Sequence, residues 1–141
     1  MRPTVLTIGS AVVILLLLGS EACVPSMECA NTIVADLPAP DGQHHAVIFD
    51  RNCGATTRVR TEVSVLARGE RPADSGNAFS TDQEFGPGLA PRLGQPLLVH
   101  WLDAQTLEIR YDGRARTVLA APRQDAVRVH YVAAGANKPA T

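Results

Sequence analysis

The side chains best suited to chemistry in this sequence lie around Cys53, which is flanked by Arg51 and Arg58. A cysteine could act as a nucleophile here, with His100 or a neighbouring histidine as its base. The spacing of these residues is not diagnostic of such a pair, and an exported cysteine that has a partner is usually oxidised. We therefore predict no catalytic residue in this stretch.

Four arginines could form a cationic patch across neighbouring strands, namely Arg51, Arg58, Arg60 and Arg110. One interpretation is structural, with the arginines paired across strands to Glu62 and Glu108. The other is a binding site for an anionic ligand such as a lipid headgroup. An exposed phenylalanine or tryptophan could add a binding platform, although each could equally belong to the core. The candidate binding residues are Arg51, Arg58, Arg60, Phe79, Phe85 and Trp101.

The histidine and carboxylate residues show no metal-binding pattern. His44 and His45 are adjacent, and adjacent residues of a strand point to opposite faces, so the two imidazoles cannot easily share one ion. No cysteine or histidine pair has zinc-site spacing, and no calcium-loop pattern is present. No lysine follows a glycine-rich segment at the offset that a phosphate loop requires. We predict neither a metal nor a cofactor.

The elements that would position Cys53 are a strand, a turn and a second strand. Residues 46–49 are an unbroken apolar run rich in strand formers. Asn52 and Gly54 favour a turn, because asparagine can bond its own backbone and glycine adopts positive φ. Residues 58–67 alternate between two faces, which predicts a strand with one buried and one solvated face.

The rest of the chain also favours strands over helices. Residues 97–111 alternate on both sides of a turn at 103–105, which predicts a hairpin, and residues 127–131 give the last strand. Aromatic residues make up 4% of the chain, with 11 glycines and 10 prolines, a composition that favours short strands and turns. We predict an all-β fold, a small antiparallel meander or sandwich of about five to seven strands after an N-terminal leader helix.

Residues 69–96 lack periodicity and contain five glycines and four prolines. A long segment without regular structure in a small domain is either functional or mobile. It also carries Phe79 and Phe85. We expect this loop to border any binding site.

The sequence around Cys53 also supports a resemblance. Residues 49–57 read F-D-R-N-C-G-A-T-T, follow a P-D-G turn at 40–42, and precede the sequence G-N-A-F at 76–79. In these features the chain resembles a group of small uncharacterised bacterial exported proteins with an F-x-R-x-C-G-A-T-T core, over roughly residues 29–131. The resemblance implies a fold and an exported location, and it transfers no catalytic role.

Residues 1–22 have the features of a targeting segment. An early arginine precedes a mostly apolar run at 5–18, and Ser20 and Ala22 place small residues before Cys23. The run is shorter than the roughly 20 residues of a comfortable membrane span. Three fates remain open: lipid attachment at Cys23, cleavage with release, and retention as an uncleaved anchor. Each places the domain in the periplasm or on the outer face of a bacterial membrane.

The expected organisation after the leader is a connector at 23–43, a β domain at 44–134 and a flexible tail at 135–141. Lipid attachment at Cys23 would leave two of the three cysteines, and we predict a disulfide between Cys29 and Cys53. The competing pair is Cys23 with Cys29.

The net charge of the chain limits the classes of partner that can be expected. The net charge is −1, so no basic excess favours nucleic acid. We predict a non-enzymatic binding or interaction module of the cell envelope, associated with the membrane through its leader or a lipid, whose partner is an envelope protein or an anionic ligand. The alternative is a small envelope hydrolase with residues 69–96 at the rim of its active site.

Overall fold

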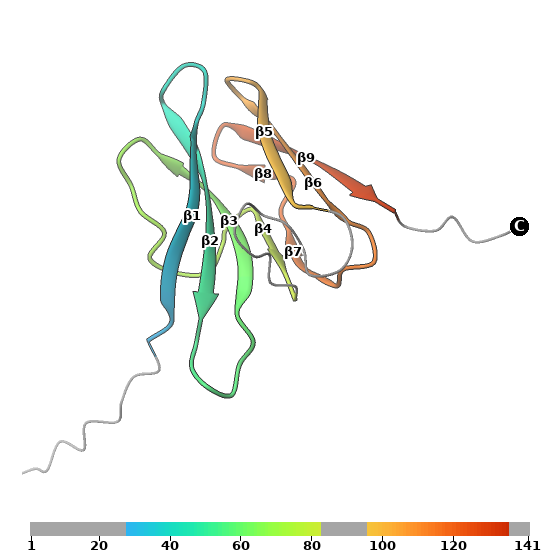
Figure 1. Ribbon diagram of the computed structural model, residues 1–141. Helices are drawn as coiled ribbons and strands as arrows, with labels where there is room; N and C mark the ends of the chain where they lie inside the picture. Colours follow the sequence, from blue (N-terminus) through green and yellow to red (C-terminus); the bar gives the residue numbers. More distant parts are fainter. Residues whose placement is uncertain (1–27, 83–95, 136–141) are drawn as a thin grey trace, which may run out of the picture.

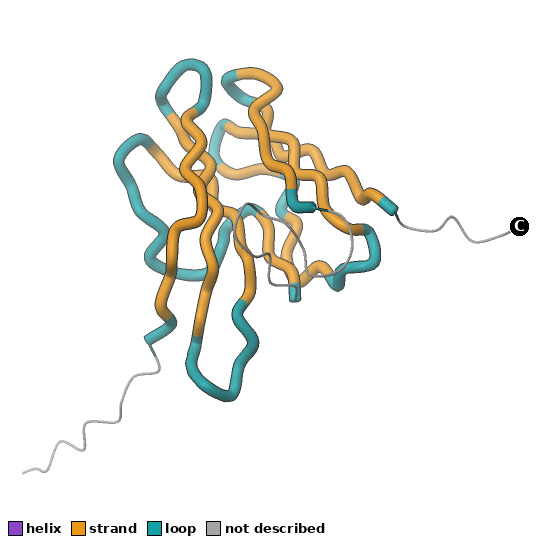
Figure 2. The backbone as a smooth tube through the Cα atoms, in the orientation of Figure 1, coloured by secondary structure: helices purple, strands orange, loops and turns teal. Residues whose placement is uncertain are grey.

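The computed structural model describes residues 28–82 and 96–135, which form strands, turns and loops without a helix (Figure 1, Figure 2). The all-β prediction is therefore confirmed for these residues. The leader at 1–22, Phe85 and all but the first residue of the expected tail lie outside them. The described part holds no helix that is long and apolar enough to cross a membrane.

The nine strands of the described residues form two sheets. The first sheet has the order β1-β2-β3-β4-β7 and is antiparallel throughout. Its strands are β1 (Ala30–Pro38), β2 (His44–Asn52), β3 (Arg60–Ala67), β4 (Phe79–Thr81) and β7 (Thr117–Ala120). The second sheet has the order β5-β6-β9-β8. Its strands are β5 (Leu98–Asp103), β6 (Thr106–Asp112), β8 (Arg123–Gln124) and β9 (Val127–Ala134).

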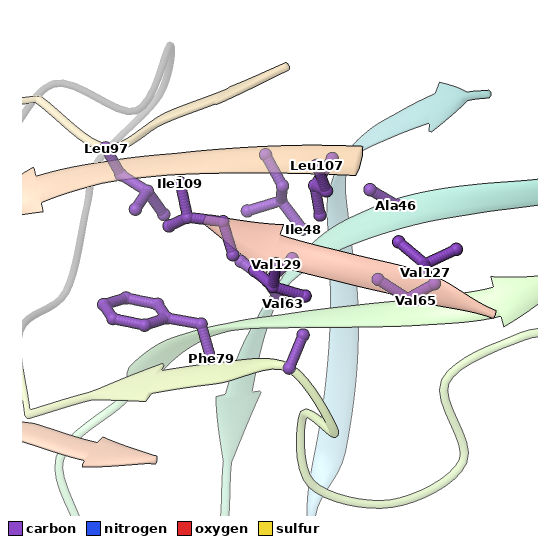
Figure 3. Close-up of a cluster of buried hydrophobic side chains, with 11 residues drawn as sticks. Ala46, Ile48, Val63, Val65, Phe79, Leu97, Leu107, Ile109, Val127 and Val129 are labelled. Carbon is purple, nitrogen blue, oxygen red and sulfur yellow. The ribbon is translucent and has the colours of Figure 1, made fainter. Parts of the chain in front are cut away.

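The core lies between the two sheets, which makes the fold a sandwich. Figure 3 shows Ile48 and Val63 of the first sheet facing Ile109 and Val129 of the second. The buried cluster consists of Ala46, Ile48, Val63, Val65, Ala78, Phe79, Leu97, Leu107, Ile109, Val127 and Val129. Alternate residues of β2, β3, β6 and β9 supply most of it, as the period-2 geometry of a strand requires.

The outer face of the first sheet is covered as well, by residues 68–77, which we call the covering segment. At one end the Asn77 side chain bonds both the N–H and the carbonyl of Val65, each at 2.8 Å. Near its middle, Asn31 of β1 donates to the carbonyls of Pro72 and Asp74, each at 3.1 Å. The segment therefore passes over β2, from β3 to β1.

This cover explains the apolar run in β2. Val47 and Phe49 point to the outer face, yet they are 1% and 0% exposed. A strand buried on both faces reads as a continuous apolar run. The expectation of a solvated outer face on β3 is wrong for the same reason, because Glu62 and Ser64 are each 2% exposed.

The first sheet also contains one segment from the expected connector and one from the expected loop. β1 lies inside the expected connector and pairs with β2 along its whole length. β4 lies inside the expected loop at 69–96, between β3 and β7, and its three residues are buried. The segment from Gly69 to Asn77 is therefore held on the sheet, and residues 83–95 lie outside the described part.

The predicted hairpin at 97–111 is confirmed as β5 and β6. The chain then crosses to the first sheet as β7, which pairs with β4, and returns as β8 and β9. β9 pairs with β6 in parallel, from Thr106 opposite Arg128 to Asp112 opposite Ala134. This is the one parallel pair among the described strands.

Candidate functional site

The turn between β2 and β3 is built by the residues around Cys53. The Gly54 N–H donates to Oδ1 of Asn52 at 3.0 Å, and the Thr57 N–H donates to the Gly54 carbonyl at 3.2 Å. Gly54 has a φ of 106°, a conformation that glycine adopts without the steric cost of a Cβ atom. The turn delivers Arg58 next to the start of β3.

A disulfide joins Cys29 to Cys53, with an S–S distance of 2.01 Å, so this pairing is confirmed. Ala30 of β1 lies opposite Asn52 of β2, and the disulfide therefore closes this end of the β1–β2 ladder. Because its sulfur is bonded, Cys53 offers no thiol for nucleophilic attack.

Three of the predicted arginines come together beside this disulfide. Arg51 and Arg60 are directly opposite each other in the β2–β3 register, and both point to the outer face. Arg58 lies two residues before Arg60 and lines the same pocket, whose volume is about 200 Å³. The complete lining is Cys29, Arg51, Cys53, Thr57, Arg58, Arg60, Glu62 and Ser75. We call this the arginine pocket.

The arginines of this pocket have no acidic partner within ion-pair distance in the part of the chain that the structure describes. Arg51 donates to Oδ1 of Asn31 at 3.0 Å, which is a neutral acceptor. Like charges on directly opposed strand residues repel each other. A bound anion would relieve this repulsion.

Glu62 is the one acidic residue in the pocket lining, and its carboxylate is bonded elsewhere. Its Oε2 accepts the Gly76 N–H at 2.5 Å, and its Oε1 accepts the Ser80 hydroxyl at 3.2 Å. The expected ion pairing between Glu62 and the arginines of β2 and β3 is therefore not formed. The pocket carries three positive formal charges and one negative charge.

The other predicted binding residues do not join this pocket. Phe79 is fully buried, with its ring centroid 5.0 Å from that of Tyr111, so it is a core residue and presents no surface to a ligand. Trp101 is half-buried and donates its indole N–H to the Leu37 carbonyl at 2.8 Å, which ties β5 to β1. Phe85 lies outside the described residues.

The second sheet carries a separate charged cluster on its outer face. Glu108 of β6 accepts from Nε of Arg110 at 2.9 Å, and it lies 3.1 Å from Nδ1 of His130 and 3.6 Å from Nε2 of His100. The Arg110 hydrogen bond, followed by the His130 hydrogen bond, lowers the pKa of Glu108. Arg110 is thus paired, unlike the arginines of the pocket.

The sequence did not indicate the pair formed by Asp36 and His45. Nδ1 of His45 lies 2.6 Å from Oδ1 of Asp36, and its Nε2 is buried without a hydrogen-bond partner among the described residues. A cavity of about 220 Å³ lies beside it, under the covering segment. Its lining, Ile33, Asp36, His45, Val47, Gly69, Glu70, Arg71 and Pro72, contains no hydroxyl or thiol nucleophile.

No cluster of histidine, cysteine, aspartate and glutamate in residues 28–82 and 96–135 is arranged to hold a metal ion. The arginine pocket is therefore the strongest candidate site, with chemistry suited to holding an anion. No protein-family model matches the chain, and neither a curated protein nor a solved structure matches it.

Proposed function

We propose that this chain is a non-enzymatic binding module of the bacterial cell envelope, and that its ligand presents an anionic group to Arg51, Arg58 and Arg60. The observation that carries the proposal is that three arginines line one pocket of about 200 Å³, and that none of them has an acidic partner within ion-pair distance among the described residues. Guanidinium groups bind carboxylate and phosphate through paired, charge-assisted hydrogen bonds.

The surroundings of the pocket support a binding role more than a catalytic one. The disulfide and the β2–β3 turn hold the arginines on a fixed frame, and Thr57 and Ser75 add hydroxyl groups to the lining. The lining contains no histidine, and its two cysteines are bonded to each other. Such a site can hold and orient an anion through charge-assisted hydrogen bonds.

The envelope location is the second part of the proposal. The disulfide is compatible with an oxidising compartment outside the cytoplasm, and the order of charge, apolar run and small residues before Cys23 is typical of an export signal. The intact mass of protein purified from the envelope measures the fate of residues 1–22. A soluble cytoplasmic species with the complete leader would refute this location.

Binding is tested on the full chain in a neutral detergent, by calorimetric titration with glycerol 3-phosphate at low ionic strength. The double variant Arg58→Gln, Arg60→Gln should weaken binding at least ~10-fold, which is about 1.4 kcal/mol. Arg68→Gln is the matched control, because Arg68 is an exposed arginine directly after β3, at the opposite end of that strand. Its affinity should stay within about twofold of the unchanged chain.

Added salt should weaken the binding of glycerol 3-phosphate to the unchanged chain, because mobile ions screen exposed charges over about 10 Å at 0.1 M. Thermal unfolding of each variant checks that the fold is kept. Equal affinities for the double variant and the unchanged chain would contradict the assignment of the pocket.

A further inference from the structure

We propose that the anionic group bound by the arginine pocket is the phosphate of an anionic phospholipid headgroup, in the membrane with which the leader or its lipid associates the domain. This inference rests on the proposed function, because it names the ligand class of the same pocket. It adds an orientation: the end of the first sheet that carries the disulfide faces the bilayer.

The position at which the described chain begins supports this orientation. β1 starts at Ala30 and runs antiparallel to β2, so its first residue lies beside the last residue of β2. Figure 1 shows the start of β1 next to the β2–β3 turn, at one end of the sandwich. The entry of the chain, the disulfide and the arginine pocket therefore share one end of the first sheet.

The length of chain before β1 limits how far this end can lie from the membrane. Cys23, the first residue after the expected leader, is separated from Cys29 by residues 24–28. Six residue steps span at most about 20 Å, even when the chain is fully extended. The opposite end of the first sheet lies a further nine-residue strand away, or about 30 Å. A tether at Cys23 thus holds the disulfide end of the first sheet within about 20 Å of the anchor, whereas the turn at 40–42 can lie about 30 Å farther away.

The chemistry of this end suits a headgroup. The pocket volume of about 200 Å³ accommodates a phosphate with its glycerol portion, while the acyl chains stay in the bilayer. The turn from Cys53 to Val59 contributes Arg58, two threonines and no acidic residue, so it meets no charge repulsion at an anionic surface.

The test uses the full chain, prepared from the envelope with its leader or lipid as it occurs and inserted into nanodiscs. One set contains phosphatidylcholine alone, and the other contains phosphatidylcholine with phosphatidylglycerol. Phenylglyoxal modifies accessible arginines, and peptide mapping by mass spectrometry gives the modification rate at each position. Arg68 serves as the control within the same molecule, because it lies beyond the opposite end of β3.

We expect Arg58 and Arg60 to react at least ~3-fold more slowly in the phosphatidylglycerol discs, which corresponds to occupancy of roughly two thirds of the pockets. Arg68 should react at the same rate in both. A parallel arm adds inorganic phosphate to the phosphatidylcholine discs. Protection by inorganic phosphate, without any difference between the two lipid compositions, would overturn the headgroup assignment and leave the proposed function standing.

The remaining outcomes are also decisive. Equal slowing of Arg68 would show a general surface effect and would overturn the pocket as the site of lipid contact. If Arg58 and Arg60 react with phenylglyoxal more slowly than Arg68, and at the same rates in both lipid compositions, the bilayer shields them sterically without recognition of the anionic headgroup. Absence of protection by either phosphatidylglycerol or inorganic phosphate would overturn both proposals.

Discussion

Gly76 of the covering segment is the position at which a single methyl group should be most damaging. A Cβ atom there would lie 2.9 Å from each of three atoms: Cβ of Glu62, the Phe79 carbonyl oxygen and the Val63 carbonyl oxygen. Two of these atoms belong to the backbone of β3 and β4, so a side-chain rotation cannot relieve the contact. Gly76→Ala must therefore move the covering segment or the sheet.

The expected loss of stability has two parts. Overpacking of a tight site costs about 1–3 kcal/mol. The displacement also breaks the hydrogen bond from the Gly76 N–H to Glu62, and the loss of one donor to a buried carboxylate costs about a further 1–3 kcal/mol. We expect Gly76→Ala to lower the free energy of unfolding by about 2–6 kcal/mol, from a total of roughly 5–15 kcal/mol for a small domain.

The assay is thermal and urea unfolding of the full chain in neutral detergent, with Gly69→Ala as the control. Gly69 has a φ of 86° and open space around its Cα atom, so its alanine variant pays only for the left-handed backbone, about 1–2 kcal/mol. Both variants remove the same entropy from the unfolded chain, and that contribution cancels in the comparison. Each kcal/mol should shift the Tm by about 4–8 °C in a domain of about 100 residues. Equal Tm values for the two variants would refute the close packing of the covering segment on β3.

Three further outcomes are expected. Replacing Cys29 and Cys53 together by alanine should lower the free energy of unfolding by about 3 kcal/mol. The disulfide joins residues that are 24 positions apart, and the chain-entropy model gives about this value for a loop of that size. Urea unfolding measures the loss of stability, and an unchanged unfolding midpoint would contradict this prediction. The lowered pKa of Glu108 means that its charged form contributes stability fully above the ordinary value of 4.5, and that this contribution is lost as pH falls through the lower folded-state pKa. The stability difference between the unchanged chain and Glu108→Gln should therefore shrink from pH 6 to pH 3, and a difference that grows on acidification would show the opposite sign. Tyr131→Phe should cost about 1–2 kcal/mol, since its hydroxyl is within hydrogen-bond distance of the carbonyls of Ala78 and Ala121; a Tm equal to that of the unchanged chain would show that these contacts are dispensable.

The local sequence pattern was sufficient to predict those strands that bury one face or both faces in the core. The alternation in β3 and in the β5–β6 hairpin predicted those strands, and the turn residues Asn52 and Gly54 marked the reversal between β2 and β3. The pairing of Cys29 with Cys53 followed from cysteine number and compartment. The cationic patch was one of two interpretations of the arginines, since residues on one face of neighbouring strands lie close together; Arg51, Arg58 and Arg60 line one pocket, whereas Arg110 lies on the second sheet.

The features that sequence did not predict depend on contacts between distant segments. β4 has three residues, too few to show a period, and it is a strand because β3 and β7 lie on either side of it. The burial of Glu62 could not be read from β3 alone, since it depends on Gly76 and on the covering segment. Asp36 and His45 lie close together because a register shift between Ile33 and Ala35 changes which residues of β1 lie opposite those of β2. No local sequence pattern encodes such a shift.

The parallel pairing of β6 with β9 has a consequence for how the molecule is made. β9 lies between β6 and β8 in the second sheet, so the last strand of the described chain is an inner strand. When the N-terminal part of the chain appears first, strands β1, β2 and β3 can pair with their neighbours in sequence. Strand β6 can pair with β9 only after residues 127–134 have followed β7. Pairing between strands that are distant in sequence slows folding, since loop closure precedes the gain from contacts. During that delay β6 exposes an unpaired edge, and an exported chain is then most open to capture by a chaperone, a protease or another copy.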